Sequence, residues 1–545
     1  MMTEYHNPIL PGFHPDPSIC RVGKDFYLAC SSFEYFPGVP VYHSRDLIHW
    51  DLQGYCFTAP EALPISGCAS SAGIYAPTLR WHDGRFYLVT TNTSGKGHIL
   101  TSAEKPDGPW TMPVRIDQTG IDPSVLFDGD KVYFCCNNLG DGGRQGIFLS
   151  EIDIRTGKTL TVPRCISYGT GGRYVEGPHL YHIGKFYYLL VSEGGTEYGH
   201  MIAFLRSEDP YGPYETCPHN PVLTHRDAGG YPIQAVGHGD LAEDTDGNWW
   251  MVCLGIRPLP GLLLHTLGRE TFLAPVSWDA DGWPVVNGGC RLEEEMEGPL
   301  PGSACIEAGS QAGAVRDIRR QMPEDQAAVD FTEDFSGGLR PEWRTLRAPL
   351  GVDRLRTQDG RLYLKAAGKK LSDDRSTPAM LCVPQTEFCV QCETTAVLPE
   401  ASGDCWGLTA FYGADYHYDV YVKNAGGKTF ACFRKRLDDM ECELVKLPLP
   451  AGLKKIRLLI RADQEQYRFY VQPCIGTENP EKTAETGKTE AAGAPLLLGS
   501  GLAAGLATEG THYMSFTGVM FGLFADSGEG IFDSFAIRKR EKRNV

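Results

Sequence analysis

One repeated unit constrains the fold of this chain more than any other feature of its sequence. Each copy has an acidic or small polar residue, a short apolar segment, a glycine-containing turn and an aromatic-rich strand. The five copies begin at DPSICRVGKDFYLACSS, APTLRWHDGRFYLVTTNT, DPSVLFDGDKVYFCCNN, EGPHLYHIGKFYYLLVSEGG and GHGDLAEDTDGNWWMVCLG. Their starts lie roughly 45 to 65 residues apart, a spacing typical of four-stranded propeller blades with loop insertions. The repeat therefore predicts a five-bladed β-propeller over residues 1–295.

Three of the copies have a carboxylic acid at the same position. Asp16 and Asp122 each begin an Asp-Pro-Ser, and Glu176 begins a Glu-Gly-Pro. A single acid in such a turn often does no more than accept hydrogen bonds from backbone amides. Because three of the five equivalent positions are acidic, we favour a shared site on the propeller axis. Ala76 and the Gly239-Asp240 pair would face the same axis from the other two copies.

The composition agrees with an all-β protein and argues against some partners. Among 545 residues, 63 are glycine and 37 are proline, many at turn positions, which favours many short strands over long helices. The formal net charge of -17 makes a surface that repels phosphate backbones, so we expect no nucleic acid partner. The basic cluster IRKREKRNV is interpreted as a solvated terminus.

The printed sequence shows no signal for export or membrane insertion. Its first residues, MMTEYHNPILPG, lack a cationic region followed by an apolar core. No segment approaches the roughly 20 apolar residues that span a bilayer. The 18 cysteines are scattered without zinc-site spacing, as is typical of reduced thiols. We therefore predict a cytoplasmic protein with no membrane partner.

The second half of the chain has a different pattern. Residues 296–329 are charged and rich in glycine and proline, and they are interpreted as a linker or wrap between domains. From FTEDFSGGLRPEWRTL onward, short segments alternate apolar and polar residues, which predicts a β-sandwich over residues 330–545. Residues 476–510 offer few large side chains, so we expect a mobile insertion there.

The three acids have the chemistry that hydrolysis of a glycosidic bond needs. One carboxylic acid must protonate the leaving oxygen, and one carboxylate must activate water or attack the sugar. Asp16, in a stiff turn between two prolines, suits a group that stays ionised. Glu176 would be the acid if a second negative charge, that of Asp122, raised its pKa.

Longer segments resemble one known family. GFHPDPSICRVGKDFYLACSSFEYFPGVPVYHSRDLIHW, IDPSVLFDGD, VEGPHLY and LGRETFLAPVSW are similar to signature segments of glycoside hydrolase family 43, in its β-xylosidase-like group with an appended β-sandwich. The resemblance implies a five-bladed propeller that hydrolyses β-xylosides or α-L-arabinofuranosides with inversion and without an obligatory cofactor. By matching motifs, it implies that Asp16 is the general base, Asp122 the modulator of the acid's pKa and Glu176 the general acid.

The resemblance also implies residues that bind the sugar. Phe33, in SSFEYFPG, resembles an aromatic residue of the sugar site, although a phenylalanine after a strand is more often core. Arg269, in LGRETF, resembles an arginine that donates to sugar hydroxyls; read alone, it is equally a surface salt-bridge partner. His238, in GHGD, resembles an axial histidine that holds water or, in some relatives, Ca2+; the alternative is a structural histidine.

Two positions bear on the size and shape of the sugar site. Xylosidases of this group commonly carry tryptophan in a GGIWAP segment, whereas this chain has AGIYAP with Tyr75, a smaller ring with a hydroxyl group. SFTGVMFG resembles a loop through which the second domain reaches the propeller, which makes Phe516 a lid over the sugar; Phe516 or Phe521 as ordinary strand residues is the alternative. A lid would favour the release of single sugars from chain ends.

The sequence thus predicts an exo-acting hydrolase that releases xylose from β-1,4-xylo-oligosaccharides by an inverting mechanism. The first alternative is α-L-arabinofuranosidase activity, alone or beside xylosidase activity, because the two sugars can place their hydroxyls similarly. A non-catalytic carbohydrate-binding protein is more distant, since all three acids are present. A propeller phosphorylase would need more cationic residues near the site than Arg269 and His238. The sequence leaves the oligomeric state open, a homo-oligomer included.

Overall fold

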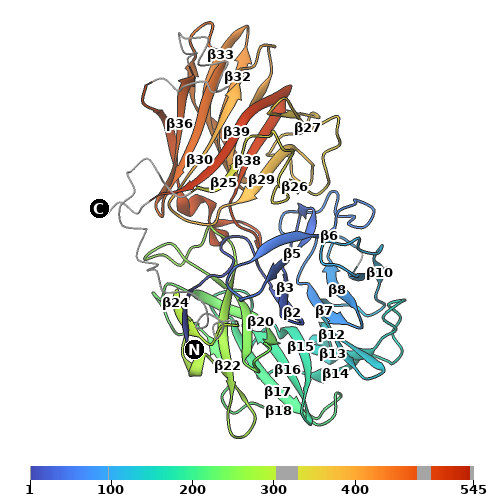
Figure 1. Cartoon of the computed structure of the whole chain (residues 1–545). Helices are drawn as coiled ribbons and strands as arrows, with labels where there is room; N and C mark the ends of the chain where they lie inside the picture. Colours follow the sequence, from blue (N-terminus) through green and yellow to red (C-terminus); the bar gives the residue numbers. More distant parts are fainter. Residues whose placement is uncertain (1, 96, 302–328, 475–492, 541–545) are drawn as a thin grey trace, which may run out of the picture. The chain divides into compact units, whose positions relative to one another are not determined.

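The computed structural model describes residues 2–95, 97–301, 329–474 and 493–540, which form two units (Figure 1). The first unit is Met1–Leu262 with Gly268–Gly313, and the second is Leu263–Leu267 with Ala314–Val545. Among the described residues, the helical segments are four short 3-10 turns and none is long and apolar enough to cross a membrane. The predicted all-β class is confirmed.

Five antiparallel sheets make up most of the first unit. The first sheet contains β2 (Ser18–Val22), β3 (Asp25–Ala29), β5 (Gly38–Ser44) and β6 (Asp51–Phe57). The second contains β7 (Thr78–His82), β8 (Arg85–Asn92), β9 (Gly97–Ala103) and β10 (Val114–Arg115). The third contains β11 (Ile121–Asp128), β12 (Lys131–Leu139), β13 (Gln145–Glu151) and β14 (Arg164–Ser167).

The remaining elements of this unit follow the same order along the chain. The fourth sheet contains β15 (Glu176–Ile183), β16 (Phe186–Glu193), β17 (Met201–Ser207), β18 (Glu215–Thr216) and β19 (Leu223–Thr224). The fifth contains β20 (Gln234–Glu243), β21 (Trp249–Ile256), β22 (Glu270–Trp278) and β23 (Pro284–Val286). The short elements are β1 (Thr3–His6), β4 (Tyr35–Phe36), β24 (Glu295–Gly298), η1 (Asp141–Gly143) and η2 (Asn287–Gly289).

A glycine turn joins the first two strands of every sheet. The turn glycines are Gly23, Gly84, Gly129, Gly184 and Gly247, with φ between 62° and 82°. A Cβ atom at any of them would meet no atom within 4 Å. Glycine is therefore needed here for the left-handed backbone of a tight hairpin and not for space.

The first strands of the five sheets contact one another in a closed cycle. β2 contacts β7, β7 contacts β11, β11 contacts β15, β15 contacts β20, and β20 contacts β2 again. The N-terminal strand β1 pairs with β24 after the fifth sheet. Asn7 next to it exchanges two hydrogen bonds with the backbone of Leu273 in β22, at 3.0 and 2.9 Å. The start of the chain is thus fastened to its last sheet.

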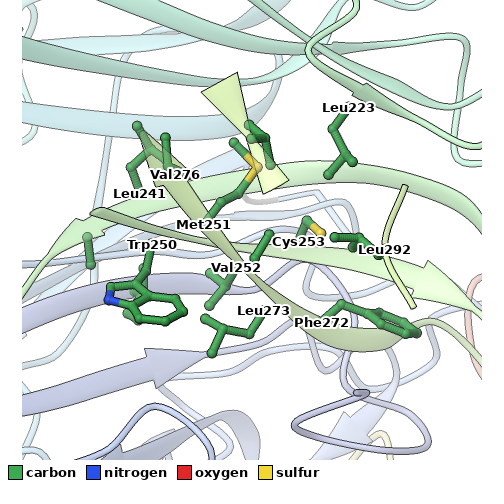
Figure 2. Close-up of a cluster of buried hydrophobic side chains, with 14 of the residues drawn as sticks. Leu223, Leu241, Trp250, Met251, Val252, Cys253, Phe272, Leu273, Val276 and Leu292 are labelled. Carbon is green, nitrogen blue, oxygen red and sulfur yellow. The ribbon is translucent and has the colours of Figure 1, made fainter. Parts of the chain in front are cut away.

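A large apolar cluster of this unit includes most of the buried side chains of the fifth sheet (Figure 2). Its strand β21, WWMVCLGI, is buried at seven of eight positions, and Trp250 is fully buried. The indole N–H of Trp250 donates to Asp244 at 3.2 Å, and its ring packs edge-on against Tyr5. Both faces of β21 are covered, which explains why its sequence is almost entirely apolar and does not alternate with polar residues.

The second unit is a sandwich of two antiparallel sheets, as the sequence predicted. The larger sheet contains β25 (Val329–Glu333), β27 (Leu355–Gln358), β28 (Arg361–Lys365), β30 (Val390–Val397), β35 (Lys455–Ala462), β36 (Gln466–Cys474), β37 (Leu496–Leu502) and β39 (Glu529–Lys539). The other contains β29 (Ala379–Pro384), β31 (Cys405–Gly413), β32 (Tyr416–Ala425), β33 (Lys428–Leu437), β34 (Met440–Pro448) and β38 (Met520–Ser527). The remaining elements are β26 (Thr345–Leu346), η5 (Ala503–Leu506) and η6 (Thr508–Gly510). Phe433 and Phe469, with ring centroids 4.9 Å apart, join the two sheets.

The sequence predicted a mobile insertion at 476–510. Residues 475–492 lie outside the described residues, and for the rest of the range the prediction is wrong. From Leu496 the chain forms β37, which pairs with β36. A Cβ at Gly499 would lie 2.3 Å from the ring of Phe433, and one at Gly501 would lie 2.3 Å from the ring of Tyr418. The small residues of this stretch serve close packing against aromatic rings and not mobility.

The predicted linker at 296–329 is described only at its ends. Its first residues belong to β24 and its last residue begins β25. Residues 302–328 lie outside the described part of the chain. The start of the segment is therefore a strand of the first unit.

Replacing Trp250 with alanine tests the packing of the first unit. The change removes a fully buried indole, so the free energy of unfolding should fall by about 3–5 kcal/mol, as for large-to-small changes in cores. Urea unfolding followed by circular dichroism measures it. Leu160→Ala, at a side chain that is 65% exposed, is the control and should cost less than about 0.5 kcal/mol. Equal losses for both variants would contradict the described core.

Candidate active site

The structure brings the three predicted carboxyl groups together at the starts of three first strands. Asp16 lies two residues before β2, Asp122 is the second residue of β11, and Glu176 is the first residue of β15. The carboxylate of Asp122 accepts a hydrogen bond from the backbone N–H of Gly177 at 3.1 Å, which joins the third sheet to the fourth. The charges of Asp16 and Asp122 both act on the pKa of Glu176, so all three share one site.

A left-handed residue marks the same place on four of the first strands. Asp16 has φ of 54°, Asp122 52°, Gly177 57° and His238 48°. The pairing register shifts beside three of these residues, in β11, β15 and β20. Such irregularities re-aim side chains away from the regular alternation of a strand. Each acid is thus presented by a local bend of the backbone, and aspartate and glycine tolerate that conformation better than most residues.

Asp16 is buried but surrounded by donors. Arg269 donates to its two oxygens at 2.7 and 3.3 Å, and Ser31 donates to it at 2.5 Å. Nδ1 of His238 lies 3.9 Å from the same carboxylate. Burial by itself would raise the pKa of Asp16. The electrostatic effects of Arg269 and His238, together with the hydrogen bond from Ser31, outweigh burial and lower the pKa. Asp16 therefore stays ionised although it is buried.

Glu176 has the opposite electrostatic environment. Burial raises its pKa, the negative charges of Asp122 and Asp16 raise it further, and Arg269 offsets only part of this, so that the pKa is about 8. Burial also raises the pKa of Asp122, with Asp16 adding to the effect and His238 opposing it. Because like charges cannot all be buried together at low cost, Glu176 holds its proton near neutral pH.

Arg269 is held on several sides. Its guanidinium also donates to the hydroxyl of Thr196 at 3.1 Å and lies 5.5 Å from the ring centroid of Phe33. The next residue, Glu270, begins β22 and is itself fixed by a buried ion pair with Arg257 at 2.7 Å. The alternative reading of Arg269 as a surface salt-bridge partner is therefore wrong, because Arg269 and its partner Asp16 are both buried; its binding of sugar hydroxyls stays a prediction.

Phe33 and Tyr75 form an aromatic wall next to the acids. Their ring centroids are 5.2 Å apart, and the ring centroid of Phe13 lies 6.0 Å from that of Phe33. Backbone hydrogen bonds between Phe33 and Ile74, at 2.9 and 3.1 Å, fix the two loops that carry these rings. The charges of Arg269, Asp122 and Asp16 act on the Tyr75 hydroxyl, which places Tyr75 within the site.

His238 packs against the residue that follows Glu176. A Cβ at Gly177 would lie 3.1 Å from Nδ1 of His238, so glycine allows the imidazole to approach this close. The backbone N–H of His238 donates to Ser192 at 2.7 Å. Over the described ranges, no group of three or more His, Cys, Asp or Glu side chains could hold a metal ion. Nothing in the arrangement supports the Ca2+ expected near His238.

One sequence expectation has a different outcome, and another is not tested. Asp240 does not line the acid site, because it pairs with Arg80 at 2.7 Å and is fully buried. Phe516 belongs to the second unit, in the segment between η6 and β38. Its role as a lid stays a prediction.

Sequence reasoning missed three residues of the site. Ser31 donates to Asp16, Thr196 accepts from Arg269, and His200 contributes to the lowered pKa of Asp16. The ring of His200 occupies the space where Gly237 has no side chain, since a Cβ there would lie 2.2 Å from it. Ser31 follows β3, at the end of the hairpin that begins just after Asp16, and this position could have been found from the repeat. Thr196 and His200 lie in the loop between β16 and β17, and no sequence pattern marks them.

Family models match both units of the chain. Residues 5–284 match the model for glycosyl hydrolases family 43. The chain belongs to glycoside hydrolase family 43. Residues 330–536 match the beta xylosidase C-terminal concanavalin A-like domain. The predicted glycosidase class and the resemblance found in the sequence are thereby confirmed.

Relatives of the chain carry the names of two related activities. A non-reducing end alpha-L-arabinofuranosidase, BoGH43B of Bacteroides ovatus, is 38% identical over 96% of this chain and 92% of its own. A xylosidase/arabinosidase of Butyrivibrio fibrisolvens is 47% identical over 55% of this chain and 60% of its own. The crystal structure of xylan beta-1,4-xylosidase from Bacillus halodurans is 31% identical, with a TM-score of 0.84 over 98% of this chain and 100% of that one.

The titration of Glu176 tests the electrostatics of the site. Its carboxyl should lose its proton at about pH 8, seen as loss of a C=O band in infrared difference spectra against Glu176→Gln. Asp122→Asn should move this loss to lower pH, because the charge of Asp122 is the largest cause of the raised pKa after burial. The control, Glu208→Gln, removes an exposed carboxylate paired with Lys185 and should leave the band unchanged. Loss of the band near the ordinary glutamate value of about 4.3 would contradict the site.

Proposed function

We propose that this chain is an exo-acting glycoside hydrolase that releases xylose from β-1,4-xylo-oligosaccharides with inversion of configuration. The observation that carries the proposal is the pairing of an ionised Asp16 with a protonated Glu176, whose pKa is about 8. Two carboxyl groups in opposite protonation states are what acid and base catalysis of glycoside hydrolysis requires.

Asp16 and Glu176 act together in a single displacement at the anomeric carbon. Asp16 accepts a proton from a water molecule as the water attacks the anomeric carbon, and Glu176 donates its proton to the leaving oxygen. Asp122 keeps the pKa of Glu176 high without contacting the leaving group. An inverting enzyme holds its acid and base about 6.5–9.5 Å apart, which leaves room for the water. The guanidinium of Arg269 keeps Asp16 ionised, and its planar, forked geometry is of the kind that binds sugar hydroxyls.

We infer that the five sheets are the blades of a five-bladed propeller. The support is the cycle of contacts between the first strands, which returns from β20 to β2. A closed ring of sheets brings the starts of all first strands around one axis. Acids at the starts of three of those strands then converge on one sugar.

Exo action is proposed from the aromatic residues. Tyr75 and Phe33, whose ring centroids are 5.2 Å apart, are aromatic residues of the kind on which sugars stack. Phe516 is proposed as a lid that closes the site beyond the terminal sugar. A site closed on one side accepts only the end of a chain.

An α-L-arabinofuranosidase, or an enzyme with both activities, is the second candidate. It is favoured by the name of the Bacteroides ovatus relative, which matches 96% of this chain. Tyr75, in place of the tryptophan expected of xylosidases, adds a hydroxyl group beside the sugar. The opposite protonation states of Asp16 and Glu176 argue against a protein that only binds carbohydrate. The cytoplasmic location and the oligomeric state stay predictions.

Proton NMR of two reactions tests the substrate and the stereochemistry together. The enzyme is given 4-nitrophenyl β-D-xylopyranoside and 4-nitrophenyl α-L-arabinofuranoside in separate samples. We expect faster hydrolysis of the xyloside, with α-xylose as the first product. Faster hydrolysis of the arabinofuranoside would select the second candidate. The β-anomer as the first product of the xyloside would contradict inversion.

Glu176→Gln tests the general acid. Glutamine keeps the side-chain size but cannot supply the proton, so kcat on xylobiose should fall by about 10²–10⁴-fold. The loss on the 4-nitrophenyl glycoside should be smaller, because this leaving group needs little protonation. Calorimetric titration with xylose should show an affinity within about threefold of the native protein. Glu208→Gln is the matched control, and turnover of xylobiose by Glu176→Gln at the native rate would contradict the assignment.

A further inference from the structure

A second group of polar residues spans all five first strands of the first unit. It includes one charged pair, Arg80 on β7 and Asp240 on β20, and neutral partners on the other three strands. Its members are Ser18 on β2, Arg80 on β7, Ser124 on β11, His179 and Tyr181 on β15, and Asp240 on β20. We call these six residues the axial layer.

Arg80 is the hub of the axial layer. It donates to both oxygens of Asp240 at 2.7 and 3.0 Å and to the hydroxyl of Ser18 at 3.2 Å. Nη2 of Arg80, which also donates to Asp240, lies 2.8 Å from Nδ1 of His179. This Nδ1 is 3.2 Å from the hydroxyl of Ser124. Since Arg80 can only donate, Nδ1 is the acceptor and the ring proton of neutral His179 is on Nε2. One guanidinium thus connects three other strands directly, β2, β15 and β20, and reaches β11 through His179.

Asp240 closes the ring of sheets. It accepts from the hydroxyl of Ser18 at 2.7 Å and from the backbone N–H of Ile19 at 3.0 Å, both on the first sheet. It also accepts from Tyr181 on the fourth sheet at 2.6 Å. Its side chain is fully buried, and that of Arg80 is 15% exposed. The last sheet is therefore fixed to the first and fourth by a single carboxylate.

The axial layer follows the catalytic layer directly along the same strands. Ser18 comes two residues after Asp16, and Ser124 comes two residues after Asp122. His179 comes three residues after Glu176. At β11 and β15, regular pairing resumes at the axial-layer residue itself after the irregular stretch that carries the acid. The layer therefore anchors each bend at the point where it rejoins the strand.

We propose that the axial layer is a positioning device which sets the relative placement of Asp16, Asp122 and Glu176, with Arg80 as its central residue. The proposal rests on the catalytic roles proposed above. Arg80 acts on Glu176 through His179, and Asp240 acts on Asp16 through Ser18 and Ile19. Six polar partners in fixed directions hold the five strands at one spacing, whereas apolar side chains can slide and repack.

The alternative is that this layer only stabilises the fold. The two roles differ in what a variant loses. A stabilising group lowers the unfolding temperature and leaves kcat unchanged well below it. A positioning group lowers kcat with little change in KM, because misplacement of about 1 Å can cost 10²-fold in rate. A displaced general acid also slows substrates with poor leaving groups more than those with good ones.

The test compares Arg80→Met and Arg80→Lys with a matched control. The control is Arg434→Met in the sandwich unit, where Arg434 is also buried and bonded to two carboxylates, Asp419 and Asp526. For each variant, kcat and KM are measured on xylobiose and on 4-nitrophenyl β-D-xylopyranoside, well below the unfolding temperature. The arabinofuranosyl counterparts replace these substrates if the native enzyme prefers them.

We expect Arg80→Met to lose about 10- to 100-fold in kcat on the disaccharide, with KM within about threefold of the native value. The loss on the nitrophenyl glycoside should be smaller. Arg80→Lys keeps the positive charge but loses the forked set of N–H donors, so its kcat should lie between the native value and that of Arg80→Met. Arg434→Met should lower the unfolding temperature and keep the native kcat.

Several outcomes would overturn the proposal. Native kcat in Arg80→Met with a lowered unfolding temperature would show a stabilising role only, as would equal kcat losses in Arg80→Met and Arg434→Met. If Arg80→Met does not fold, Ser18→Ala and Ser124→Ala replace it, because each removes only one hydroxyl of the axial layer. A native kcat in both of these variants would also overturn the proposal. A native protein that hydrolyses none of these glycosides contradicts the proposed function itself, and the positioning role falls with it.

Discussion

The site depends on the cost of burying like charges together. Asp16, Asp122 and Glu176 share one small volume, and only one cation, Arg269, bonds directly to any of them among the described contacts. That cation ionises Asp16, and the remaining repulsion and burial leave the proton on Glu176. Arg269, with smaller contributions from His238 and Ser31, therefore makes the pKa of Asp16 differ from that of Glu176. The protonation states follow from the placement of Arg269 and not from the chemistry of the carboxyl groups themselves.

The same strands hold two polar layers with different properties. Asp16 and Asp122 have a left-handed backbone with φ near 50°, and Glu176 comes directly before the left-handed Gly177, where sheet pairing is interrupted. The axial layer around Arg80 and Asp240 begins where regular pairing resumes. Strained backbone persists at a functional site only when its surroundings fix it. A fully bonded ion pair on neighbouring strands supplies such a constraint, which is the physical basis of the positioning role proposed for it.

Much of the fold and part of the site could be predicted from sequence. The hairpin glycines, the aromatic strands and the acids recur at matching places, so the repeat located Asp16, Asp122 and Glu176. Composition misled at Gly499 and Gly501, which read as a mobile segment but pack against aromatic rings of β33 and β32. The repeat also misled at Asp240, which lies two residues after the left-handed His238 and is therefore level with Ser18 and Ser124 and not with Asp16 and Asp122. Its distant partner Arg80 withdraws it from the site, and a repeat pattern does not contain that pairing.

The sequence by itself determined the all-β class, the two-part organisation and the positions of the three acids, because hairpin turns and strand alternation are local properties of the chain. Only the tertiary structure decided which acid is ionised. Arg269 is 253 positions from Asp16 in the chain, and Ser31, His238 and His200 come from other loops. A pKa depends on distances between charges and on burial, and both arise only when the five sheets assemble.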